Sequence, residues 1–65
     1  MKMQEIREMS KEEKLKKLTE LENELLRLRT LVRSGGALEN PGQIRAVRKD
    51  IARIKLALRE EGYKV

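Results

Sequence analysis

Two apolar repeats, separated by a Gly-Gly pair and an Asn-Pro pair, are the feature that most constrains how this chain can fold. In each repeat an aliphatic residue recurs at alternating steps of three and four, which aligns the apolar side chains along one edge of an α-helix. This aligned row, here termed the seam, predicts packing against another helix. The first seam is Leu18, Leu21, Leu25, Leu28 and Val32, and the second is Ile44, Val47, Ile51, Ile54 and Leu58.

The first helix is predicted over residues 11–33 from the signals at its two ends. Ser10 followed by Glu13 fits a capping box, in which each side chain accepts a hydrogen bond from a backbone N–H left unpaired at a helix start. Gly35 and Gly36 end the helix, because glycine adopts the left-handed geometry of a helix C-terminus at little cost. A loop over residues 34–39 is predicted to follow.

The second helix is predicted over residues 41–61. Asn40 is a favoured N-cap, and Pro41 suits the first helical position because its missing N–H would be unpaired there anyway. Gln43 completes a second capping box, and Gly62 closes the helix. Two helices with seams of equal length and a short connection are expected to fold back on each other as an antiparallel hairpin.

Residues 1–65 are therefore predicted to form one all-α domain, an antiparallel two-helix hairpin with coiled-coil-like packing. The N-terminal arm, residues 1–9, carries Met3, Ile6 and Met9 at helical spacing and predicts a short helical turn that docks on another element. A lone hairpin of this size can bury only a small core, so a partner that adds contacts is expected.

Four leucines lie off the two seams and are candidate contact points for such a partner. An isolated surface leucine is also common in soluble proteins and needs no partner to explain it, so both interpretations stay open. The four are Leu15, Leu26, Leu31 and Leu56.

The residue types that are missing exclude most kinds of chemistry. The chain has no cysteine and no histidine, which removes the usual zinc and iron sites, disulfides, and Ser-His or Cys-His catalysis. Tyr63 is the only aromatic residue, so a platform for base stacking is not expected. We therefore predict no enzymatic activity, no cofactor and no small-molecule substrate. No apolar run reaches the length of a membrane span or a signal core, which predicts a soluble, cytoplasmic protein without a membrane partner.

The cations of both helices are predicted to share one face of the hairpin. The formal net charge is +5, which favours a polyanionic partner. Advancing about 100° per residue around each helix places Arg29 and Arg33 across from Arg45 and Arg48. The reverse face is predicted to carry acidic residues, namely Glu13, Glu20, Glu24, Asp50 and Glu61.

A rigid rod with arginines along one face can contact several phosphates of folded RNA at once and release condensed counterions. An ordinary solvated face is the plainer interpretation of the same charges. A membrane-surface role is less favoured, because the main apolar stripe is used by the seams. A homo-oligomeric coiled-coil adaptor, in which the seams pair between chains, is the alternative from another functional class.

Several short motifs resemble the large-subunit ribosomal protein family numbered twenty-nine, whose members are small helical hairpins. The most specific segment is Asn40-Pro41 followed by Ile44-Arg45, Val47-Arg48 and Ile51-Ala52-Arg53-Ile54. Glu5-Ile6-Arg7 with Ser10 and, at the end of the first helix, Glu24-Leu25 and Leu28-Arg29 also match. The Ser34-Gly35-Gly36 loop lacks a glutamine common in bacterial members, which makes the chain similar to the archaeal branch.

The resemblance implies a structural ribosomal protein that binds large-subunit ribosomal RNA near the mouth of the peptide exit tunnel. It also implies ribosomal protein twenty-three as a neighbour and nascent-chain targeting factors as further partners. Four basic positions of the family motif carry over as RNA contacts: Arg29, Arg45, Arg48 and Arg53. The helical-wheel argument alone adds Arg33, Lys49, Lys55 and Arg59.

Overall fold

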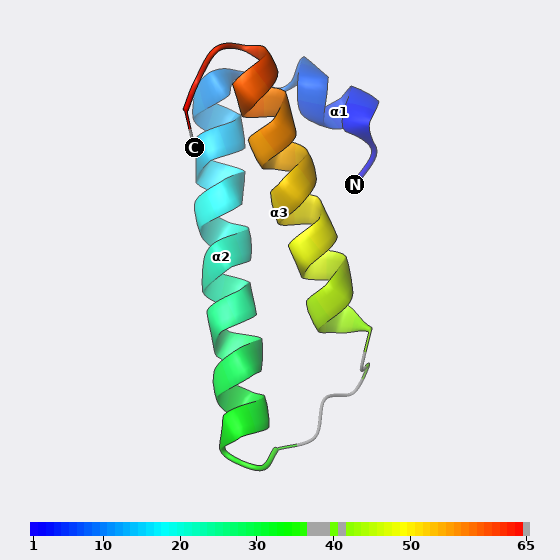
Figure 1. Cartoon of the computed structure of the whole chain (residues 1–65), viewed down its shortest axis with the longest axis vertical. Coiled ribbons are helices and arrows are strands. Elements are labelled where there is room, and N and C mark those ends of the chain that lie inside the picture. The colour runs from blue at the N-terminus through cyan, green and yellow to red at the C-terminus, as the bar shows by residue number, and fades with distance from the viewer. Residues whose placement is uncertain (37–39, 41, 65) are drawn as a thin grey trace.

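The computed structural model describes residues 1–36, 40 and 42–64, and all regular structure within these ranges is helical. A short helix, α1 (Met3–Glu8), precedes two longer ones, α2 (Lys11–Arg33) and α3 (Gln43–Glu60). Figure 1 shows α2 and α3 running antiparallel side by side, with α1 against the C-terminal half of α3. The predicted all-α hairpin with a short N-terminal helical turn is confirmed.

The helix α2 begins and ends at the residues that the sequence indicated. The hydroxyl of Ser10 accepts a hydrogen bond of 3.1 Å from the backbone N–H of Glu13, which is the serine half of the predicted capping box. At the other end Gly35 has φ of +85°, and the N–H of Gly36 donates to the carbonyl of Leu31 at 2.9 Å. This left-handed turn pairs a backbone carbonyl that the helix itself leaves open.

The second long helix starts two residues later than predicted, at Gln43 rather than residue 41. Gly42, not Asn40, is the N-cap of this helix and has no side-chain cap hydrogen bond, and the side chain of Asn40 accepts a hydrogen bond of 2.9 Å from the N–H of Gly42 in the turn just before it. The predicted first position, Pro41, and loop residues 37–39 lie outside the described residues. At the far end the helix closes at Gly62, with φ of +88°.

The core lies along the seams between α2 and α3. Buried seam residues are Leu18, Leu21, Leu28, Val47, Ile54 and Leu58, and Leu25, Ile44 and Ile51 pack against them partly exposed. The seam prediction is wrong for Val32, which is 48% exposed. The last turns of α2 extend beyond the first residue of α3 (Figure 1), so this side chain has no facing helix to bury it.

The N-terminal arm docks on its own chain. Ile6 of α1 is fully buried in the core, and Ala57 of α3 is 1% exposed although the sequence placed it outside the seam. Arg7 joins the two helices through Nε to Glu60 Oε1 at 3.2 Å and Nη2 to Oε2 at 3.3 Å. The flank of α3 that carries Ala57 is therefore covered by α1, rather than free as part of an open acidic face.

A buried lysine links the N-terminal half of α2 to the end of α3. Lys14 is 1% exposed, and its Nζ lies 2.9 Å from Oε2 of Glu61. The cation is removed from water, and its partner among the described residues is this one carboxylate, whose own side chain is 41% exposed. Such a pair fixes the register of the two helices, because sliding either helix would leave the buried charge without its partner.

Removing either member of this pair should give opposite results. Glu61→Ala strands the buried ammonium of Lys14 and should lower the free energy of unfolding by about 1–2 kcal/mol, less than for a fully buried pair because water reaches Glu61. Lys14→Met keeps the volume without the charge and should leave stability equal or higher. Urea unfolding followed by circular dichroism measures both, and equal losses in the two variants would contradict this role for the lysine.

Candidate nucleic-acid interface

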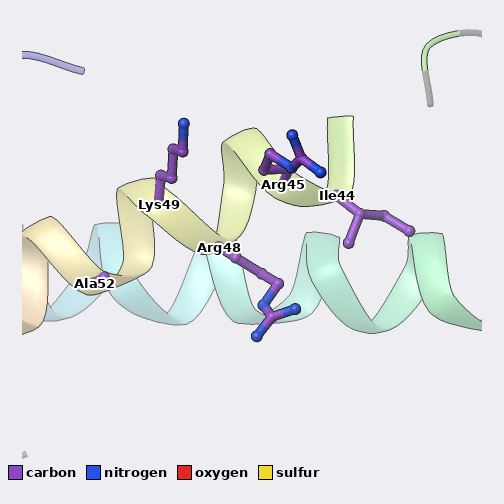
Figure 2. Close-up of a pocket in the computed structure, with 5 residues that line it drawn as sticks. All are labelled: Ile44, Arg45, Arg48, Lys49 and Ala52. Carbon is purple, nitrogen blue, oxygen red and sulfur yellow. The ribbon is translucent and has the colours of Figure 1, made fainter. Parts of the chain in front are cut away.

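The outer surface of α3 carries a group of cations that point into solvent. Arg45, Arg48 and Lys49 are exposed and, with Ile44 and Ala52, line an open hollow of about 500 Å³. Figure 2 shows Arg48 and Lys49 leaving α3 in opposite directions. The hollow is thus bordered by positive charge on two sides.

A second hollow, between α2 and α3, brings cations of both helices to one face. Arg29 of α2 and Lys55 of α3 line it, together with Glu22 and Leu26. Leu25 and Ile51, from the edges of the two seams, complete it. The antiparallel packing therefore gathers positive side chains from both helices, as the wheel argument expected for Arg29 and Lys55.

Two further predicted residues lie toward opposite ends of this surface. Arg59 is exposed in the last turn of α3, four residues beyond Lys55 on the same side of the helix. Arg33 is exposed at the end of α2, on the part that extends past α3. The overhang separates Arg33 from the turns of α3 that it was expected to face.

Arg53, the remaining predicted residue, also lies apart from this group. Its Nη1 donates a hydrogen bond of 3.2 Å to Oδ1 of Asp50, and both side chains lie on the flank of α3 nearer to α1. The same carboxylate oxygen lies 3.3 Å from the amino group of Met1. A phosphate that binds Arg53 would compete with this carboxylate, so we rank Arg53 below the other cations as a contact.

The charge of the remaining cations is uncompensated within the described chain. None of them forms an ion pair within 4.0 Å with a carboxylate of residues 1–36, 40 and 42–64. They are Arg29, Arg33, Arg45, Arg48, Lys49, Lys55 and Arg59. With respect to these ranges their N–H groups can donate to an external anion, and arginine can offer two parallel bonds to one phosphate. We name these seven residues the basic surface.

Ala52 also lines the α3 hollow, at its C-terminal end, and was not predicted as a site residue. The available signal was an alanine with cations three and four residues before it and three residues after it, since these positions surround a side chain on a helix. The wheel placed Ala52 on the basic side but gave it no role.

The off-seam leucines divide into two groups. Leu26, Leu56 and Leu31 are 65%, 51% and 38% exposed and stay available for a partner. Leu15 is partly buried and packs against the core, as does Tyr63, so its apolar surface is partly used within the chain. The chain doubles back after Gly62 and covers this end of α2, which the helical wheel of a single helix could not show.

Within the described residues no helix has both the length and the apolar character to cross a bilayer.

Comparison with known proteins gives consistent matches along most of the chain. The family described as Ribosomal L29 protein matches residues 4–60. The large ribosomal subunit protein uL29 of Archaeoglobus fulgidus is 77% identical over 64 residues, covering 98% of this chain and 94% of that protein. The proteins of the same name from Methanothrix thermoacetophila and Caldanaerobacter subterraneus are 55% and 57% identical, covering 86% and 92% of this chain and 84% and 89% of their own lengths.

Proposed function

The chain belongs to the ribosomal L29 protein family, and from this premise we propose that it is a structural component of the large ribosomal subunit that holds ribosomal RNA on its basic surface. Membership makes it a ribosomal protein of the large subunit, located in the cytoplasmic ribosome. The proposal adds the RNA contact and the residues that make it.

The observation that carries the RNA contact is the set of cations on the outer surface of α3 and the neighbouring edge of α2 that form no ion pair with a carboxylate of the described residues. Phosphates of a folded RNA lie close together, and neutralising several of them releases counterions, which is a large favourable contribution to binding. The major groove of an A-form helix is too narrow for side chains to read, so binding rests on phosphates and shape. The helices supply rigidity, because buried core residues fix where each cation points.

Burial of the seam residues within a single chain disfavours the homo-oligomeric coiled-coil adaptor. Leu28, Ile54 and Leu58 are at most 2% exposed within a single chain, so these side chains are not free to pair with a second copy. The family is one of structural ribosomal proteins, and we propose no catalytic role for the basic surface.

We also propose that the protein lies near the mouth of the peptide exit tunnel, beside ribosomal protein twenty-three, where factors that receive nascent chains dock. The resemblance of the sequence motifs to the family supports this placement. Exposed Leu26, Leu31 and Leu56 supply apolar surface for protein neighbours. Crosslinks from these positions in assembled large subunits should reach proteins, whereas crosslinks from Arg45 or Arg48 should reach RNA.

The RNA contact is tested by measuring the affinity of the purified protein for large-subunit ribosomal RNA at several salt concentrations. Four or more phosphate contacts should make the logarithm of the binding constant fall with the logarithm of salt with a slope of about −3 or steeper. Sedimentation without RNA should show a monomer. A stable RNA-free dimer or tetramer with no affinity for RNA would contradict the proposal and favour the homo-oligomeric coiled-coil adaptor.

A further inference from the structure

Ala52 is a short, exposed side chain enclosed by longer ones. Its neighbours on the helix surface are Arg48, Lys49, Lys55 and Leu56, at three and four residues before and after it. Ala52 lines the C-terminal end of the hollow that Arg48 and Lys49 border, and Figure 2 shows those two side chains leaving α3 in opposite directions. The result is a saddle on α3 with a small floor and a cation on each side.

A saddle of this form admits a backbone rather than a base. Unpaired bases are usually recognised by stacking on aromatic side chains, and the chain has one aromatic residue. That residue, Tyr63, lies at the far end of α3, with the Nζ of Lys11 4.4 Å from the centre of its ring. The saddle itself offers N–H donors and methyl or methylene groups, which suit phosphate oxygens and ribose.

We propose that the saddle at Ala52 seats the sugar-phosphate backbone of duplex RNA, with α3 lying against the wide, shallow minor groove and Arg48 and Lys49 donating to phosphates on either side. The inference rests on the proposed RNA-binding function and names the form of RNA that is bound. Duplex RNA is recognised largely by shape and by phosphate and 2′-hydroxyl contacts across this groove. Alanine permits close approach, because its side chain ends at Cβ.

Bulk at Ala52 should therefore weaken binding without removing any charge. In Ala52→Gln the longer side chain fills the floor of the saddle and holds the backbone away. Its matched control is Ala46→Gln, on the same helix and also exposed, which lies outside the lining of either hollow on the basic surface. Glutamine is a good helix former, so both variants should keep the helical content of the wild type. Ala52→Ser keeps the side chain short and should retain affinity.

The experiment measures the affinity of the full chain for an RNA hairpin with a long stem and for an unpaired RNA of equal length. Wild type should prefer the stem. Ala52→Gln should bind the stem about tenfold more weakly, equivalent to roughly 1.4 kcal/mol, with Ala46→Gln and Ala52→Ser close to wild type. Circular dichroism confirms that each variant is folded.

Two results would overturn the saddle while leaving RNA binding intact: equal affinities of the two glutamine variants for the stem, or a preference of wild type for unpaired RNA. In the first case the cations bind RNA without close contact at Ala52, and in the second the bound form is not duplex. Failure of wild type to bind either RNA would overturn the proposed function itself. The outcomes are therefore distinguishable.

Discussion

Leu58→Ala should lower the free energy of unfolding by about 2–5 kcal/mol and leave much of the chain unfolded, whereas Leu56→Ala should change it by about 0.5 kcal/mol or less. The two leucines are two residues apart on α3, but Leu58 is fully buried and Leu56 is 51% exposed. Truncating Leu58 removes apolar contacts and leaves a cavity between the helices. The helical signal in circular dichroism during urea unfolding measures both losses.

Leu56 is the matched control because the chemical change and the helix are the same. Any difference between the variants then reports burial rather than helix propensity. Equally small losses in both variants would contradict the assignment of Leu58 to the core. The comparison needs a small effect at Leu56 as well as a large one at Leu58, since a loss at both positions would indicate that the outer surface of α3 is also packed.

Replacing Arg45 and Arg48 together by alanine should weaken binding to large-subunit ribosomal RNA and flatten its salt dependence. Each lost phosphate contact lowers the slope of the log–log plot by roughly 0.7–0.9, so the double variant should lose about 1.4–1.8. Both residues are exposed and lie outside the core, so stability should stay near that of the wild type. Fluorescence anisotropy with a labelled RNA fragment, repeated at several salt concentrations, measures the slope.

Lys16→Ala with Lys17→Ala is the control for net charge, because it also removes two cations. These lysines line a different hollow, with Glu13 and Glu20, in which both signs of charge are present. The control should weaken binding slightly through the overall field and leave the slope nearly unchanged. A slope unchanged in the Arg45 and Arg48 variant, or reduced equally in the control, would assign the arginines to solvent.

The helices and the face shared by Arg29 and Lys55 could be predicted because they depend on local spacing. Ser10 and Gly35 terminate α2 through bonds within a few residues of themselves, and an apolar step of three or four fixes which edge of a helix packs. Val32 continues the same pattern, yet its burial depends on how far α3 reaches along α2. How far α3 reaches along α2 depends on both helices, so it cannot be predicted from the apolar spacing within one of them.

Lys14 and Ala57 are the opposite case, because they are buried although the sequence pattern did not predict their burial. A lysine and an alanine off the seam carry no sequence signal for burial, and both are buried because distant segments cover them. Lys14 gains its carboxylate from Glu61, 47 positions further along the chain, and Ala57 lies on the flank of α3 that α1 covers. Arg53 is a different case, because its ion pair with Asp50 joins residues three apart on α3 and follows from local helix spacing.

The three helical segments and the fold-back between the long ones could be read from the residue pattern, as could the family resemblance, because capping, glycine geometry and apolar periodicity act over a few residues. The docking of α1 on α3, the burial of Lys14, and the set of cations around Ala52 that form no ion pair with a described carboxylate are visible only in the folded chain. These depend on contacts between segments far apart in the chain, where small differences in helix length and packing angle decide which side chains meet.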